Sequence, residues 1–122
     1  MQDNTNFFKK ANDSYNARDY KRAIDLYQKA LEYNENESGS LYNSAVCHIK
    51  LKNFQKAIEF LNSAIKIKRD SKYFFNLGYC YAMLSNNPKA LYYFNLSWSL
   101  NNEDNDCEKA IGLILDNYRK TN

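Results

Sequence analysis

Glycine, proline and cysteine are scarce in this sequence, and the shortages exclude several kinds of protein. The three glycines are too scattered to form a glycine-rich phosphate loop. Three cysteines, an odd number without a CxxC pair, argue against a disulfide framework and are typical of a reducing compartment. The chain is therefore expected in the cytoplasm.

A long apolar segment is also lacking. The longest aliphatic run, residues 111–115 (IGLIL), is far shorter than the roughly 20 residues that a helix needs to cross a bilayer. The first residues lack the apolar core of a secretory signal. A formal net charge of +3 is too small to predict the basic face of a nucleic-acid-binding protein, although it slightly favours an acidic partner.

What the sequence does have is many aromatic residues, 16% of the chain, and a recurring segment. Residues 20–31 (YKRAIDLYQKAL) return as 54–65 (FQKAIEFLNSAI) and as 87–98 (NPKALYYFNLSW). The alanine at the fourth position of each copy recurs after 34 and then 33 residues: Ala23, Ala57 and Ala90. Self-similarity at this period predicts a stacked helical solenoid.

Apolar residues at helical spacing predict seven helices in one all-α domain, residues 1–122. Six helices form three antiparallel hairpins at about residues 4–37, 38–70 and 71–104, and a last helix at about 105–120 covers the end of the stack. The apolar stripe of the last helix comprises Cys107, Ile111, Ile114, Leu115 and Tyr118.

Short polar residues mark the expected helix starts. Asp19 and Asn53 are predicted to cap the second helices of the first two hairpins. Asn87, which precedes the proline, is predicted to do the same in the third hairpin. Asn105 begins a capping-box pattern at the last helix.

Small residues mark the expected close contacts between helices. Ala11, Ala45 and Gly78 are predicted where the two helices of a hairpin approach within about 8–10 Å. Gly112 has the matching position in the last helix. Residues 34–39 (NENESG) contain no apolar side chain and are predicted to form the loop between the first two hairpins.

These positions resemble the tetratricopeptide repeat family. Its pattern is a small residue in the first helix, an aromatic after the turn, and then alanine, an aromatic and alanine in the second helix. The second repeat matches with Ala45, Phe54, Ala57, Leu61 and Ala64, and the first with Ala11, Tyr20, Ala23, Tyr27 and Ala30. The third departs from the pattern at Asn87 and Ser97, and the late proline of each repeat is missing.

The resemblance implies a right-handed superhelical solenoid whose first helices line a concave groove that commonly holds an extended peptide. The peptide-binding residues that it implies are Phe8, Lys9, Asn12, Tyr42, Asn43, Lys72, Phe75, Asn76 and Tyr79. Tyr15, Val46 and Lys50 map to the same groove. Asn43 and Asn76, one repeat apart, resemble an asparagine ladder that holds peptide backbone, with the rings supplying most of the affinity.

Some family members bind the C-terminal carboxylate of heat-shock chaperones through a clamp of Lys, Asn, Asn, Lys and Arg. The aligned residues here are Phe8, Asn12, Asn43, Lys72 and Asn76. The asparagines and one lysine agree, but the first lysine and the arginine are replaced. Since only arginine offers a planar fork for a carboxylate, the resemblance does not extend to a complete clamp.

No catalytic, metal or cofactor site is predicted. Cys47, Cys80 and Cys107 lie on apolar stripes and are interpreted as small core residues. His48 is interpreted as a packed core histidine, with catalysis or metal binding as the alternative. No paired carboxylates accompany a recognisable pocket. The sequence therefore does not predict an enzyme.

Three functions remain for such a chain. The first is a protein–protein interaction module that binds an extended peptide segment of a partner in the groove. Acidic segments are included among the expected ligands. The alternative is a solenoid scaffold, a monomer or weak homo-oligomer, that associates through Trp98, Tyr92, Tyr93 and the last helix. RNA binding, which would weaken steeply with salt, ranks third.

Overall fold

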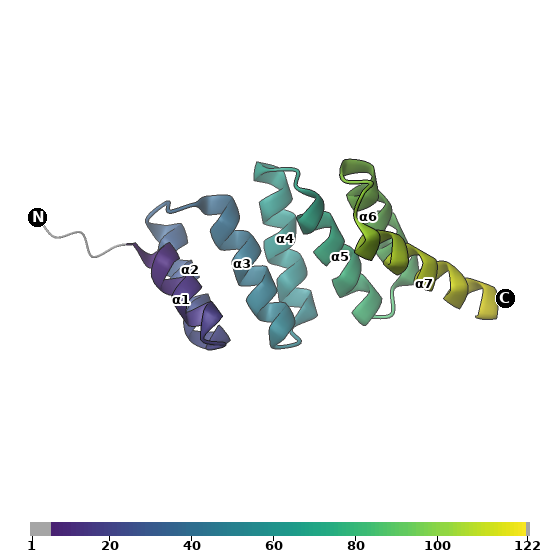
Figure 1. Cartoon of the computed structure of the whole chain (residues 1–122). Coiled ribbons are helices and arrows are strands. Elements are labelled where there is room, and N and C mark those ends of the chain that lie inside the picture. Colours follow the sequence, from purple (N-terminus) through teal and green to yellow (C-terminus); the bar gives the residue numbers. More distant parts are fainter. Residues whose placement is uncertain (1–5, 122) are drawn as a thin grey trace, which may run out of the picture. The chain divides into compact units, whose positions relative to one another are not determined.

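The computed structural model describes residues 6–121, and in this range it contains seven helices and no strand (Figure 1). The helices are α1 Phe7–Asn16, α2 Tyr20–Glu32, α3 Glu37–Lys50, α4 Phe54–Ile67, α5 Ser71–Met83, α6 Asn87–Leu100 and α7 Asn105–Thr121. The all-α class is confirmed. Residues 4 and 5 of the predicted first helix, and the side chain of Tyr118, lie outside what the structure describes.

The chain divides into two compact units, Met1–Lys68 with α1–α4 and Arg69–Asn122 with α5–α7. Consecutive helices within each unit pack against each other, as Figure 1 shows for the α1–α2 and α3–α4 pairs. None of the described helices is both long enough and apolar enough to cross a membrane. The single domain predicted over residues 1–122 stays a prediction.

The first unit is built around a tyrosine among small residues. Tyr27 of α2 is 1% exposed and clusters with Ala11 of α1, Ala23 of α2 and Cys47 of α3, all fully buried. Because an alanine occupies little space, the neighbouring helices can approach closely enough to enclose the tyrosine ring. Three successive helices thus share one core side chain.

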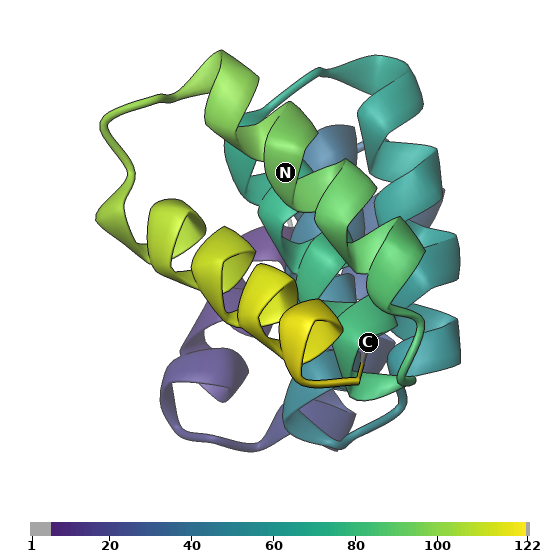
Figure 2. The same cartoon turned by 90° about the vertical axis from the view of Figure 1, so that its right-hand side faces the viewer.

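The second unit has a core between α6 and α7. Ala90 and Phe94 of α6 cluster with Cys107 and Ile114 of α7, and all four are buried. Figure 2 shows α7, in yellow, lying beside the green α6 and connected to it by a wide loop. The predicted stripe of α7 is therefore confirmed at Cys107 and Ile114, whereas Leu115 is 37% exposed.

The turns within the hairpins do without glycine. Arg18, Lys52 and Ser85 adopt left-handed backbone conformations with φ of 63°, 63° and 62°. In each turn the next amide reaches back to the preceding helix, as when Asp19 N donates to Ser14 O at 2.9 Å. These bonds satisfy helix-end carbonyls that would otherwise lack partners. The backbone of the turn repeats with the same period as the alanines.

The predicted helix caps are right in position for two hairpins. Asp19 accepts from Arg22 N at 3.1 Å, as predicted. Asn53 does precede α4, but its side chain makes no capping bond. In the third hairpin Asn86, rather than Asn87, accepts from Lys89 N at 3.2 Å. The prediction was one residue late because the left-handed Ser85 ends the turn earlier.

The capping residue of α7 and the extent of the loop before α3 were predicted wrongly. At α7 the cap is Asp104, whose Oδ1 accepts from the backbone N of Asp106 and Cys107, so Asn105 lies inside the helix. Residues 34–39 are not all loop, because α3 begins at Glu37. Asn36 adopts a left-handed conformation and accepts from Gly39 N at 3.1 Å, which allows the helix to begin before the glycine.

The small residues were predicted correctly in the hairpins and wrongly in α7. Ala11 and Ala45 are fully buried, and a Cβ added to Gly78 would lie 2.6 Å from the Phe94 ring. Gly112, in contrast, is exposed and has no atom within 4 Å of such a Cβ. Gly112 therefore does not mark a helix contact among the described residues, because no further helix packs on that side of α7.

The two glycines should respond oppositely to the same substitution. Gly78→Ala should lower the free energy of unfolding by about 1–3 kcal/mol, because the buried Phe94 ring must move. Gly112→Ala should raise it by about 0.5–1 kcal/mol, because alanine favours the helix without meeting a neighbour. Urea unfolding followed by circular dichroism measures both. A Gly78→Ala variant as stable as the wild type would contradict the close contact.

Candidate functional site

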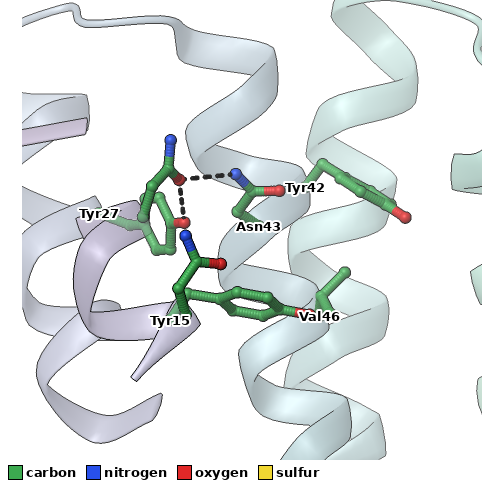
Figure 3. A pocket seen from close by; sticks show the side chains of 7 residues that line it. Tyr15, Tyr27, Tyr42, Asn43 and Val46 are labelled. Atoms are coloured by element: carbon green, nitrogen blue, oxygen red, sulfur yellow. Dashed lines mark hydrogen bonds between the residues drawn. The ribbon is translucent and has the colours of Figure 1, made fainter. Parts of the chain in front are cut away.

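The candidate site is a cavity in the first unit, beside α1, α2 and α3. Its volume is ≈ 370 Å³. The lining residues are all uncharged: Asn12, Tyr15, Asn16, Tyr27, Tyr42, Asn43 and Val46. Figure 3 shows Tyr15 reaching toward Val46, with Tyr42 on the α3 side. A site of this size with a few convergent polar groups is typical of ligand binding.

Two hydrogen bonds converge on one amide oxygen in this cavity. Asn12 Oδ1 accepts from the hydroxyl of Tyr27 and, at 3.2 Å, from Nδ2 of Asn43 (Figure 3). Asn12 lies on α1, Tyr27 on α2 and Asn43 on α3. Since the Tyr27 ring is locked in the core, its hydroxyl fixes Asn12, and Asn12 in turn orients Asn43.

Burial raises the pKa of two tyrosines of the cavity, Tyr27 and Tyr15, above the ordinary value. It raises the pKa of Tyr27 to about 12, with a further contribution from the neighbouring Cys47 thiol. Burial also raises the pKa of Tyr15. Because the Tyr27 hydroxyl keeps its proton at physiological pH, it remains a donor to Asn12. The cavity therefore stays neutral, and its bonding pattern does not change near neutral pH.

The two hydrogen bonds to Asn12 Oδ1 decide which groups of the Asn12 and Asn43 amides remain for a ligand. Asn12 commits its oxygen to internal bonds and retains an Nδ2 group with two N–H donors. Asn43 commits one N–H and retains its Oδ1 acceptor. A donor and an acceptor on adjacent helices match the alternating C=O and N–H groups of an extended peptide.

The cavity brings together only part of the predicted site in the first unit. Asn12, Tyr42 and Asn43 line it. Phe8 is half-buried and packs against the Tyr27 ring of the core cluster, with centroids 5.9 Å apart. Lys9 lies on the exposed face of α1, where its Nζ is 3.3 Å from Asp13 Oδ2. Neither lines the cavity.

The other predicted site residues all lie on α5, in the second unit. Lys72 and Tyr79 are exposed. Phe75 is half-buried against Phe94, with centroids 5.3 Å apart, and Asn76 Nδ2 donates to Lys72 O at 2.9 Å. The Asn76 amide is therefore bonded to its own helix, while that of Asn43 is bonded to a neighbouring one. The ladder that combines Asn43 and Asn76 stays a prediction.

Two lining residues, Asn16 and Tyr27, were missing from the residues predicted to line the groove. Tyr27 was assigned to the core only, although its hydroxyl reaches the cavity. Asn16 was not assigned because it ends α1, where the helical pattern no longer indicates a direction. A search for a polar atom on a core aromatic could have found Tyr27, since a buried hydroxyl usually needs a partner.

The cysteine thiols are buried, and the histidine ring is stacked on a phenylalanine ring. Cys47, Cys80 and Cys107 are free, buried thiols, and burial raises the pKa of both Cys47 and Cys80 to about 12. The His48 ring stacks on Phe60 at 5.4 Å, its Nδ1 is buried without a hydrogen-bond partner, and burial lowers its pKa. Within residues 6–121 no three His, Cys, Asp or Glu side chains gather as metal ligands.

The residues of the scaffold alternative are divided between core and surface. Trp98 packs against the α6–α7 core, so it contributes to this unit's own stability. Tyr92 is 60% exposed, and Tyr93 is half-buried between Tyr81 and Tyr92. On α7, Leu113 and Leu115 are also exposed, at 66% and 37%. Association through this surface stays a prediction.

Comparison with known proteins agrees with the pairing of consecutive helices in this structure. A family model described as tetratricopeptide repeat matches residues 15–78. The chain belongs to the tetratricopeptide repeat family. The resemblance inferred from the alanines and aromatics is thus confirmed, and so are the predicted helical hairpins.

Several characterised proteins contain a similar segment. The chain is 28% identical over 112 residues to the Hsp70-Hsp90 organising protein of Plasmodium falciparum, covering 92% of this chain and 17% of that protein. It is 26% identical over 95 residues to the BBSome complex member BBS4 of Bos taurus, covering 78% and 18%. The chain therefore spans less than a fifth of the length of these relatives.

A solved structure of similar fold carries a chaperone ligand. It is described as the TPR2AB domain of yeast Sti1 in a complex with pHSP90, and it matches with a TM-score of 0.83 and 25% identity. The match covers 94% of this chain and 47% of that one. The fold of this chain is therefore similar to that of a domain described in complex with pHSP90.

The hydrogen bond between Tyr27 and Asn12 should be visible as coupling in stability. Asn12→Ala leaves a buried hydroxyl without its acceptor and should cost about 1–3 kcal/mol of unfolding free energy. In a Tyr27→Phe background the same change should cost about 1 kcal/mol less, because no hydroxyl is left unpaired.

Urea unfolding of the two single variants and the double variant measures this coupling. The matched control is Asn95→Ala, an exposed asparagine in α6, which should change stability by less than about 0.5 kcal/mol. Additive effects of the Asn12 and Tyr27 substitutions would show that the two side chains do not depend on each other.

Proposed function

We propose that this tetratricopeptide repeat chain is a protein-interaction module that binds an extended peptide segment of a partner. The observation that carries the proposal is the amide pair of Asn12 and Asn43, which is oriented by Tyr27 and lines an uncharged cavity. Its free donor and acceptor can bond to one peptide unit from two helices. Binding, rather than catalysis, is what such groups support.

Hydrogen bonds alone would give weak affinity. Each contributes about 0.5–1.5 kcal/mol, because the peptide and the amides give up bonds to water. Tyr42 and Tyr15 also line the cavity, and their rings offer apolar surface to ligand side chains. Together these contacts are consistent with micromolar binding, about −8 kcal/mol.

The names of the relatives support a protein as the partner, but they do not identify that protein. The Hsp70-Hsp90 organising protein is named for chaperones, and the yeast Sti1 domain is described in complex with pHSP90. In this chain Phe8 and Asn76 stand where the clamp has a lysine and an arginine, so two cationic positions are lost. We therefore propose recognition of an internal peptide segment rather than of a terminal carboxylate.

The contribution of Asn43 can be measured with a selected ligand. A library of unstructured peptides is passed over the immobilised chain, and the best binder is titrated by calorimetry. Asn43→Ala should weaken it about three- to tenfold, because one backbone hydrogen bond is lost. Asn95→Ala, at an exposed position of α6 that does not line the cavity, should leave the affinity unchanged. Unchanged affinity for Asn43→Ala would remove this residue from the site.

The neutral cavity predicts indifference to a terminal charge. The same peptide is synthesised with a free C-terminal carboxylate and with an amide, and each is titrated against the wild-type chain. Because the described residues that line the cavity include no cation, amidation should change affinity less than about twofold. A loss of about tenfold or more would indicate a carboxylate clamp, against the proposal.

A further inference from the structure

A second, larger cavity on the first unit is basic. It is lined by residues of α1 and α2 and has a volume of ≈ 550 Å³. It shares no lining residue with the cavity that contains Asn12 and Asn43, which we name the amide cavity. Its lining combines four cations with one carboxylate and two apolar side chains: Phe7, Lys10, Lys21, Arg22, Asp25, Leu26 and Lys29. We name it the basic cavity. The peptide-binding proposal makes no use of it.

A single aromatic ring concentrates the positive charge. Lys10 Nζ lies 5.3 Å and Lys29 Nζ 5.6 Å from the centroid of the Phe7 ring. The negative face of an aromatic ring attracts ammonium groups by about 0.5–1 kcal/mol at an exposed site, which holds the two lysines near one another despite their repulsion. An anion placed between them would relieve that repulsion.

The other two cations are on the neighbouring helix. Lys21 and Arg22 lie in the first turn of α2, and both are exposed. Within the described part of the chain, neither forms an ion pair with Asp25, although that carboxylate is at helical spacing from both. The charges of Lys21 and Arg22 are therefore available to a ligand.

We propose that the basic cavity binds an acidic polypeptide segment, that is, several consecutive Asp or Glu residues. The four cations match carboxylates, and Asp25 can accept from a backbone N–H while it repels a phosphate dianion. Leu26 offers contact to the aliphatic parts of glutamate.

A nucleic acid fits the basic cavity less well. Proteins that bind single strands stack bases on exposed aromatic faces. Here the Phe7 ring is occupied by Lys10 and Lys29 and packs against Tyr33, with centroids 5.3 Å apart. No stacking surface is left on the one aromatic residue of the cavity.

The test uses the full chain and a fluorescein-labelled hexaglutamate peptide at low ionic strength. The variant Lys21→Gln with Arg22→Gln should bind about tenfold more weakly, since two exposed charge contacts are lost. The matched control, Lys66→Gln with Lys109→Gln, removes the same charge from exposed positions outside the cavity and should bind within about twofold of the wild type.

A gain of affinity provides a second measurement. Asp25→Asn removes the one carboxylate among the described residues that line the basic cavity, and it should strengthen hexaglutamate binding about two- to fivefold. The variants are compared with the wild type by circular dichroism, so that a loss of binding is not a loss of fold. Asn43→Ala should leave hexaglutamate binding unchanged, which separates this site from the amide cavity.

Three results would overturn the proposal. Equal weakening in the two double variants would mean that binding follows net charge and not the cavity. Equal binding of hexaglutamine would mean that carboxylates are not recognised. Tighter binding of a single-stranded oligonucleotide of the same charge would identify a nucleic-acid site instead.

Discussion

The hydroxyl of a core tyrosine sets the geometry of the first unit. The Tyr27 ring is enclosed because Ala11 and Ala23 leave room for it, and its hydroxyl must then find an acceptor inside the protein. Asn12 of α1 is that acceptor, and it also holds Asn43 of α3. One requirement of packing thus positions the polar groups of three helices, and the cavity follows from it.

The helices could be predicted because their signals are local. Alanines at a constant period and apolar residues at helical spacing gave the hairpins correctly. Helix starts were less accurate because backbone conformation decides them. Asn36 and Ser85 adopt left-handed conformations, which place the start of α3 within the predicted loop and the cap of α6 one residue early. Neither residue type requires that conformation, so the sequence did not reveal it.

The site was predictable in composition but not in its internal bonds. Asn12 and Asn43 were expected to face a groove, and both line a cavity. That they bond to each other through Asn12 Oδ1 depends on a third side chain, which the helical pattern had assigned to the core. Phe8 shows the reverse, because an expected groove residue packs on Tyr27 instead. A pattern gives the face of a helix, whereas neighbouring side chains decide which atoms remain available.

The two cavities of the first unit differ in the physics of recognition. The amide cavity has no charge, so its interactions are short-ranged, directional and nearly independent of salt. The basic cavity acts through charges on exposed side chains, whose attraction is screened beyond about 8 Å at physiological ionic strength. A partner that carries an acidic stretch beside a neutral extended stretch would therefore be attracted by the basic cavity and held in register by the amide cavity. Because the two sets of lining residues are separate, each contribution to such binding can change without the other.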